Sequence, residues 1–301
     1  MANSFIKKSI SERLFDGINY FIMIVMIIVM LYPFWNTIVV SFNDAIDSIK
    51  GNVYIWPRKF TFYNYTNLFR TNKLIDAFWV SVSKTILVTI CNVFLSSLTA
   101  YILSRKEFVL KKIMTIFLVA TMYLSAGLIP QYFNYKDLGL INNYLVYILP
   151  GMLGAFNVIV IRTFIYGLPD SLAESAKIDG AGEFRIFIQI IMPLCKPVLA
   201  TVALWVAVGA WNEWFDTYMF ASSKQYLSTL QFEMMKLLSS SLIQSGPQNA
   251  NLAAQSSKTG TVTPTSVRSA ITIVAALPII FVYPFLQKYF ITGLYVGGVK
   301  G

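Results

Sequence analysis

The sequence predicts an all-α polytopic membrane protein with six transmembrane helices, because the chain is apolar, poor in charge and divided into long apolar stretches. Apolar residues make up 56% of the 301 residues and charged residues 13%, against roughly 25% charged residues in globular domains. One bilayer crossing needs about 20 predominantly apolar residues in a helix. Six stretches reach that length and predict one membrane domain over residues 1–301: about 18–42, 79–103, 113–132, 145–166, 199–221 and 270–291.

The first stretch, 18–42, is long for the core of a signal peptide, which has about 7–15 apolar residues, and no small-residue cleavage site follows it. We therefore expect an uncleaved first span. Proline and glycine interrupt several later stretches, which a membrane helix tolerates when its neighbours bond the freed backbone groups. These positions mark expected kinks and close contacts: Pro130, Pro150, Gly151, Gly154, Pro278 and Pro284.

The distribution of basic residues predicts the orientation. The short loop 104–112 contains four basic residues, whereas the comparable loop 131–144 contains only Lys136, and further basic residues precede the first span. Short loops retained in the cytoplasm carry the excess of Lys and Arg. We therefore expect both termini and the loop 167–198 in the cytoplasm, and the loop 222–269 on the outer side of the plasma membrane. The net charge of +10 then reflects orientation rather than nucleic-acid binding.

The residue composition argues against several kinds of catalysis and cofactor binding. The chain has no histidine, which removes Ser–His and Cys–His catalysis and the commonest zinc ligand. Cys91 and Cys195 fall in a span and in a cytoplasmic loop, so no disulfide is expected. No glycine-rich phosphate loop is visible, so nucleotide chemistry would belong to a partner. We expect no enzyme activity and no cofactor in this chain.

The loop 167–198 has the pattern of two short helices joined by a turn. Pro169, Asp170 and Ser171 form a helix-start signature, which predicts a helix over Leu172–Ile178. Gly180 suits the left-handed residue that ends such a helix. A second amphipathic helix is expected over Glu183–Ile191, with its apolar face made by Phe184, Phe187, Ile188 and Ile191.

A polar helical elbow between two membrane spans suits the docking of a soluble partner. Ala173 and Ala176 are small enough for the first helix to lie deep in a partner's groove, and Glu174 offers a carboxylate to a basic residue there. The alternative is an interfacial hairpin without a partner.

The loop resembles the EAA motif of bacterial ABC-importer permeases. The motif is present as Glu174-Ser175-Ala176, then Gly180, then Ile190-Ile191-Met192-Pro193, with both spacings intact. Ser175 and Met192 depart from the pattern conservatively. The chain is also similar to the carbohydrate-uptake branch, near the lipoprotein-associated and alginate or rhamnogalacturonan importer permeases, in further segments: Asp179-Gly180-Ala181, GLIPQY (127–132), LGLINN (138–143), WNEW (211–214) and YPFLQKYF with GGVKG (283–301).

This resemblance implies a type I ABC importer permease fold and a set of partners. A second homologous permease would form a heterodimer with this chain, and two ATPase subunits would bind ATP and Mg beneath them. An extracellular solute-binding lipoprotein would deliver an oligosaccharide, and the polar loop 222–269 would reach into it; by composition alone the middle of this loop, 239–266, could equally be loosely ordered. The coupling residues would be Glu174, Ser175, Ala176, Asp179, Gly180, Ala181 and Pro193, and the C-terminal tail with Gly298 and Lys300 would reach the ATPase.

Polar residues inside the fifth span are candidates for the substrate path, because intramembrane ionisable residues are commonly functional. Trp211, Asn212, Glu213 and Trp214 combine aromatic faces with hydrogen-bonding groups, and Asn157 in the fourth span is a weaker candidate. In the alternative interpretation, Asn212 and Glu213 bond helix backbones within the bundle and hold a kink. Lys84 in the second span is expected near the outer interface, with its ammonium group snorkelling to water.

Three alternatives to a sugar importer stay open on the residues alone. The chain could serve an ABC importer for a non-sugar solute, such as an amino acid or a phosphonate. It could be a membrane-embedded enzyme, although paired intramembrane carboxylates are not visible in neighbouring spans. It could be an ion-coupled carrier, although no inverted repeat stands out.

Overall fold

The computed structural model describes residues 9–70, 73–244 and 263–296, and its secondary structure in these ranges is helical apart from one isolated antiparallel bridge between Asn43 and Phe60. The chain divides into two compact units. The first comprises residues 1–70 with 238–274, and the second comprises 71–237 with 275–301. The units are described separately below.

Three described helices are long and apolar enough to cross a membrane by themselves. They are α1 (Ile10–Ser41), α4 (Lys73–Ser104) and the part Thr265–Val282 of α14 (Pro264–Val296). Three bent helix pairs pass the same test when each pair is taken together, which gives up to six crossings in the described part of the chain.

The first unit contains α1, the short helices α2 (Ala45–Ile49) and α3 (Tyr63–Leu68), and parts of α12 and α14. Most large apolar side chains of α1 are exposed within the single chain, as is typical of a helix that faces lipid or another subunit. The chain that follows α1 is tied back by Asn64, whose Nδ2 donates to the carbonyl oxygens of Ser41 (2.8 Å) and Asn43 (2.9 Å).

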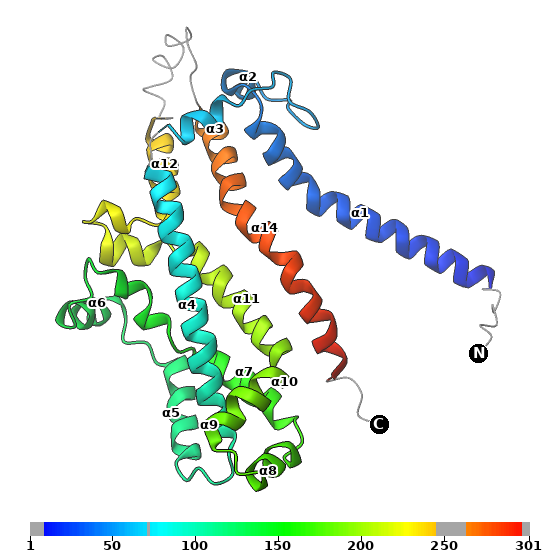
Figure 1. The fold of residues 1–301 in the computed structure, drawn as a ribbon. Coiled ribbons are helices and arrows are strands. Elements are labelled where there is room, and N and C mark those ends of the chain that lie inside the picture. Colours follow the sequence, from blue (N-terminus) through cyan, green and yellow to red (C-terminus); the bar gives the residue numbers. More distant parts are fainter. Residues whose placement is uncertain (1–8, 71–72, 245–262, 297–301) are drawn as a thin grey trace. The chain divides into compact units, whose positions relative to one another are not determined.

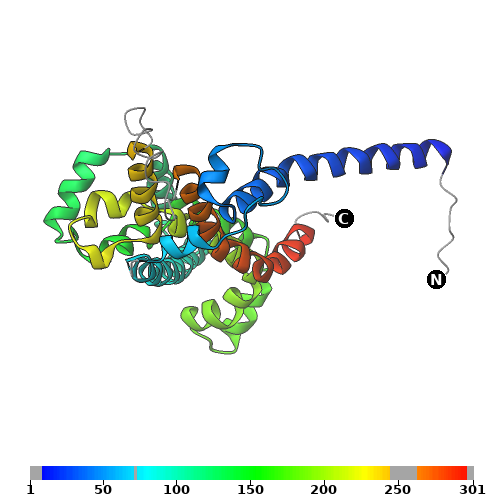
Figure 2. The same cartoon turned by 90° about the horizontal axis from the view of Figure 1, so that it is seen from above.

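The core of the second unit forms where α4 packs along α7 (Ala155–Tyr166) and α11 (Lys196–Asn212). Figure 1 shows these helices side by side, and Figure 2 looks along the length of α4. The N-terminal part of α4 lies near the start of α12 (Leu230–Gln244), because Ser81 Oγ accepts a hydrogen bond from Leu230 N at 2.8 Å. Its C-terminal part lies at the loop 167–198, where Tyr101 Oη donates to Glu183 Oε2 at 2.6 Å.

The stretch 113–132, expected as one span, is not a continuous helix. α5 (Lys111–Tyr123) ends before a break, and α6 (Leu128–Asp137) starts at an angle of 118° to it. Gly127 at the break has φ of +86°, a backbone conformation that glycine adopts without strain. Pro130 lies in the first turn of α6, where the missing N–H would have no partner within the helix in any case.

The fifth predicted span, 199–221, is also interrupted. α11 ends at Asn212, Glu213 and Trp214 are not helical, and a helical segment resumes and becomes the π-helical turn η4 (Thr217–Ala221). At its other end, α11 meets the helical segment Glu183–Leu194 at 81°. The polar loop 222–269 contains α12, which its composition did not predict; residues 245–262 of that loop lie outside the described ranges.

Candidate functional site

The loop 167–198, called the coupling loop below, begins with a short helix that ends in a tight turn. α8 spans Ser171–Ile178, which confirms the predicted helix. Gly180 has φ of +80°, which confirms the predicted left-handed residue. Gly180 N donates to Lys177 O (3.0 Å) and Ala181 N donates to Ala176 O (2.9 Å), the bond pair of a Schellman motif. The elbow is therefore held by its own backbone.

The second arm consists of α9 (Glu183–Ile186), the π-helical turn η3 (Phe187–Ile191) and α10 (Met192–Leu194). Its buried apolar side chains are Ile186, Phe187 and Ile191, whereas Phe184 and Ile188 are exposed. The predicted face was therefore only partly right. The face that packs on the core is rotated from the predicted one, with Ile186 buried in place of Phe184 and Ile188.

Of the two alanines expected to let α8 lie deep in a partner's groove, Ala173 is buried against its own chain, whereas Ala176 is only partly buried. Ala173 is buried in the core of the second unit, and Ala176 and Ala181 pack against that core. Their small size lets α8 lie close to its own chain. The face that remains open carries Glu174, Ser175, Ile178, Asp179 and Gly180, all exposed.

Ile178 is the most exposed large apolar side chain of α8, at 87% exposure against 40% for Leu172. The sequence interpretation missed it, although a signal was present: Ile178 follows Glu174 by one helical turn, on the polar side of α8. A single exposed isoleucine is unremarkable on a soluble protein. Its exposure at the end of α8, beside the turn at Gly180, makes it a candidate contact for a partner.

Ion pairs brace α8 against the loop that follows α4. Lys177 Nζ lies 2.7 Å from Glu183 Oε1 and 3.1 Å from Glu107 Oε1, so one ammonium group joins three segments. Lys106 Nζ lies 2.6 Å from Asp170 Oδ2 at the start of α8. The loop 104–112, which the sequence singled out only for its charge, is thus a structural part of the site. Figure 1 shows α8, α9 and α10 together at the same end of α4.

These contacts shift the titration of the groups involved. Hydrogen bonds to Glu183 and Glu107 raise the pKa of Lys177 above its usual range. The bond from its own backbone N–H, followed by the bond from Lys177, holds the pKa of Glu107 below its usual range. Burial acts to raise the pKa of Glu183, but hydrogen bonds from Lys177 and Tyr101 outweigh it and leave the pKa lowered. All three groups stay charged near neutral pH.

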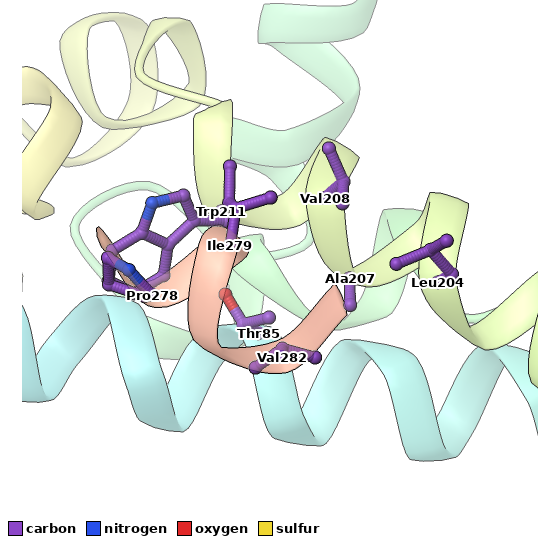
Figure 3. Close-up of a pocket in the computed structure, with 8 residues that line it drawn as sticks. All are labelled: Thr85, Leu204, Ala207, Val208, Trp211, Pro278, Ile279 and Val282. Carbon is purple, nitrogen blue, oxygen red and sulfur yellow. The ribbon is translucent and has the colours of Figure 1, made fainter. Parts of the chain in front are cut away.

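Trp211, a candidate for the substrate path, is buried between helices. Its indole Nε1 donates to Ala275 O of α14 at 3.0 Å, and its side chain is 5% exposed. The ring borders a small apolar cavity of about 70 Å³ between α4, α11 and α14, which is shown in Figure 3 with its lining residues, Thr85, Leu204, Ala207, Val208, Trp211, Pro278, Ile279 and Val282. Trp211 therefore ties α11 to the proline-containing part of α14.

Asn212 and Glu213 bond to the protein backbone, as the alternative interpretation expected. Asn212 Nδ2 donates to Val208 O at 2.9 Å within α11. Glu213 Oε1 accepts from Phe215 N at 2.8 Å and from Asp216 N at 3.4 Å, which caps the segment after the break. The Asn212 side chain is nevertheless exposed, and Trp214 is half-buried beside Phe215. The Asn212 Oδ1 accepts a further hydrogen bond from Gln231 Nε2 at 3.1 Å.

Asn157 is the centre of a buried amide chain. Its Nδ2 donates to Asn92 Oδ1 at 2.7 Å, and its Oδ1 accepts from Trp205 Nε1 at 2.9 Å. Asn92 Nδ2 in turn donates to Gly151 O at 2.7 Å. Four helical segments, α4, α7, α11 and the short η2 (Leu149–Gly151), are thereby joined by polar groups that satisfy one another, which is the role that buried amides commonly have in membrane bundles.

Lys84 does not snorkel to an interface, so that expectation was wrong. Its side chain is 2% exposed, and its Nζ donates to Glu213 O at 3.2 Å. Of the other predicted site residues, Pro193 is exposed in α10, and Gly298 and Lys300 lie outside the described residues.

In the described part of the chain, helices able to cross a membrane up to six times, together with a braced polar elbow between two of them, define a polytopic α-helical membrane protein. The chain belongs to the family of inner membrane components of binding-protein-dependent transport systems, whose family model matches residues 2–294. It is therefore a transport permease, embedded in the membrane by several spans.

Relatives match over nearly the full chain. The polygalacturonan/rhamnogalacturonan transport system permease protein YtcP of Bacillus subtilis is 33% identical, covering 96% of this chain and 99% of that protein. Protein LplC of the same organism is 32% identical, covering 96% of both chains. The arabinooligosaccharides transport system permease protein AraQ of Bacillus subtilis is 29% identical, covering 90% of this chain and 91% of that one.

The fold is also that of a solved structure. A chain in the crystal structure of a bacterial ABC transporter involved in the import of the acidic polysaccharide alginate matches with a TM-score of 0.81 and 26% identity, covering 96% of this chain and 100% of that chain. The protein thus has the type I ABC importer permease fold that the resemblance implied.

Proposed function

We propose that this chain is the permease subunit of an ATP-binding cassette importer that translocates an oligosaccharide. The full-length likeness to permeases for polygalacturonan or rhamnogalacturonan fragments and for arabino-oligosaccharides supports a sugar substrate, as does the match to an alginate transporter. The alternative is an importer of the same family whose substrate is not a sugar.

The observation that carries the coupling role is the construction of the elbow. Its backbone turn at Gly180 and the bonds of Lys177 hold it rigid, while Glu174 and Ile178 are exposed on one face. A rigid element can transmit the closure of a motor subunit to the membrane as a rigid-body movement.

The predicted coupling residues divide between two roles in this proposal. Glu174, Ser175 and Asp179 are exposed and would contact an ATPase subunit. Ala176, Gly180 and Ala181 form the turn that shapes the elbow. Pro193 would set the start of the connection to α11.

The proposed importer contains several other subunits. A second homologous permease would form a heterodimer with this chain, and two ATPase subunits would bind ATP and Mg, so that this chain needs no cofactor of its own. A solute-binding lipoprotein would deliver the sugar at the outer face, where the loop 222–269 would meet it. Both termini would lie in the cytoplasm, on the side of the coupling loop, in agreement with the basic loop 104–112.

The path for the sugar would pass the break in the fifth span. Asn212 and Trp214 offer an amide and an aromatic face that are not fully buried, a combination suited to a polyol. Trp211, Glu213 and Asn157 would support this wall through the bonds described above rather than contact the sugar.

Charge reversal at the elbow tests the proposal. In the complete complex in proteoliposomes, with the binding protein loaded with an oligogalacturonide or an arabino-oligosaccharide, Glu174→Arg is expected to abolish ATP-driven uptake while the protein still inserts. Asp137→Arg changes an exposed carboxylate at the end of α6 and serves as the matched control that retains uptake. Normal uptake by Glu174→Arg would remove the coupling role.

Calorimetry with the cognate binding protein tests the substrate class separately. Binding of an oligosaccharide supports the sugar assignment. Binding of an amino acid or phosphonate, with no oligosaccharide bound, would replace it by the non-sugar alternative.

A further inference from the structure

Lys84 is among the largest fully buried side chains in the described part of the protein, and it lies within a helix long and apolar enough to cross a membrane. A cationic side chain inside a bilayer is costly, and such residues are almost always paired or functional. The ammonium group of Lys84 donates to the main-chain carbonyl of Glu213 (Nζ to O, 3.2 Å), a residue 129 positions away in the sequence. Packing of α4 alone would need no charge at this position.

The main-chain carbonyl of Glu213 lies at the C-terminal end of α11, where the fifth span is interrupted. α11 ends at Asn212, so the carbonyls of its last turn lack the partners they would have in a continuing helix. The aligned peptide dipoles also place partial negative charge there. The side chain of Glu213 begins the next segment by accepting from Phe215 N. Lys84 therefore bonds the one residue that closes one helix and caps the following segment.

The surroundings of Lys84 are built to hold a charge. The ring of Tyr147 lies 5.0 Å from Nζ in a cation–π arrangement. The hydroxyl of Tyr147 lies 2.7 Å from Leu227 O and 3.0 Å from Thr217 Oγ1, so this ring is itself tied to the segment after the break. The carboxylates of Asp216 and Glu213 supply the negative charge that acts on Lys84.

We infer that Lys84 is a positioning residue for translocation: its ammonium group holds the break in the fifth span and thereby fixes Asn212 and Trp214 on the wall of the path. This inference rests on the proposed import function for its consequence, but the geometry at the break can be tested without transport. The two groups that contact Nζ, a carbonyl oxygen at 3.2 Å and an aromatic ring at 5.0 Å, both favour a cation.

Two substitutions separate the charge from the packing of the side chain. Lys84→Met keeps an unbranched side chain and removes the charge, whereas Lys84→Arg keeps the charge. In the assembled complex in proteoliposomes, uptake per ATP hydrolysed is expected to fall about tenfold in Lys84→Met, within the range of known couplings between sites. Lys84→Arg is expected to remain within about twofold of the wild type. Equal loss in both variants, or no loss in Lys84→Met, would overturn the inference.

The double variant Lys84→Met with Asp216→Asn covers the case in which the single variant fails to assemble. Removing both charges avoids an uncompensated buried carboxylate, so this protein should assemble. Continued loss of uptake in it supports a positioning role for the cation. Full recovery of uptake would mean that Lys84 only balances Asp216, and the inference would be refuted.

Cysteine labelling measures the accessibility of the break in the fifth span without a transport assay. In a background with Cys91→Ser and Cys195→Ala, the exposed position Asn212→Cys is labelled with a small methanethiosulfonate reagent. Lys84→Met should change the labelling rate several-fold, about 5-fold or more, and Lys84→Arg should not. Unchanged labelling in Lys84→Met refutes the inference whether or not the complex transports sugar. Changed labelling, combined with a wild-type complex that imports no oligosaccharide, would refute the proposed substrate alone.

Discussion

Gly180 is the position at which the elbow can be perturbed most cleanly. It is the left-handed residue of the turn, with φ of +80°, and a Cβ added there would meet no atom within 4 Å. Alanine at this position therefore changes backbone strain and nothing else. An L-residue forced into the left-handed region costs about 1–2 kcal/mol.

This strain shifts the equilibrium between the closed turn and the open turn. The turn is closed by the bonds Gly180 N to Lys177 O and Ala181 N to Ala176 O. A loss of about 1–2 kcal/mol shifts the ratio of closed to open turn by a factor of about 5–30. Gly180→Ala should therefore accelerate hydrogen exchange at the amide of Ala181 by about that factor, and it should reduce uptake because the coupling face is formed for less of the time.

Two matched variants sharpen the measurement. Gly180→Asn should have a smaller effect than Gly180→Ala, since asparagine enters the left-handed region more readily. Gly182→Ala removes a glycine of the same loop that has φ of −71° and equally open space around it, so it should affect exchange least. Wild-type exchange in Gly180→Ala, or a larger effect from Gly182→Ala, would refute this reasoning about the turn.

Three further outcomes are expected. Ile178→Ser should leave the melting temperature of the isolated permease unchanged, because the side chain is 87% exposed, yet weaken ATPase binding by about tenfold, as truncation of an interface anchor does; equal binding would remove Ile178 from the interface. The ion pairs of Lys177 should stabilise the elbow only while both partners are charged. Because the pKa of Glu183 is lowered, its contribution to stability is lost as pH falls below the ordinary value of 4.5. Because the pKa of Lys177 is raised, its contribution is lost as pH rises above 10.5. Melting curves at graded pH should show a smaller loss at each limit in Lys177→Met than in the wild type, because Tyr101 still bonds Glu183 in the variant. Asn157→Ala should lower the stability of the protein by about 1–3 kcal/mol, because the Trp205 indole loses its buried partner, with the apparent KM for uptake unchanged; an altered KM with normal stability would return Asn157 to the substrate path.

Local patterns in the sequence accounted for the elbow. Helix-start residues, a glycine at the right distance and the following proline are short-range signals, and α8 with its turn at Gly180 formed where they stand. The buried face of the second arm, which contains the π-helical turn η3, was assigned only in part.

The orientation of α8 was beyond the reach of local patterns. A short helix with alanines on one side can turn that side to a partner or to its own chain, and the sequence does not distinguish the two. Ala173 lies in the core because α4, α7 and α11 pack beneath it. The ion pairs of Lys177 likewise join residues that are about 70 positions apart in one case.

Composition and local spacing determined, by themselves, that this protein is a helical membrane protein with a helical elbow between two of its spans, because apolar length and turn chemistry act within a few residues of the chain. Tertiary structure alone decided what the polar residues inside the spans do. Lys84 could have reached water or the protein interior, and it bonds Glu213 because folding brings the end of a broken helix beside it. Which group a buried charge bonds depends on the helices that pack around it, and the neighbouring residues in the sequence do not specify that group.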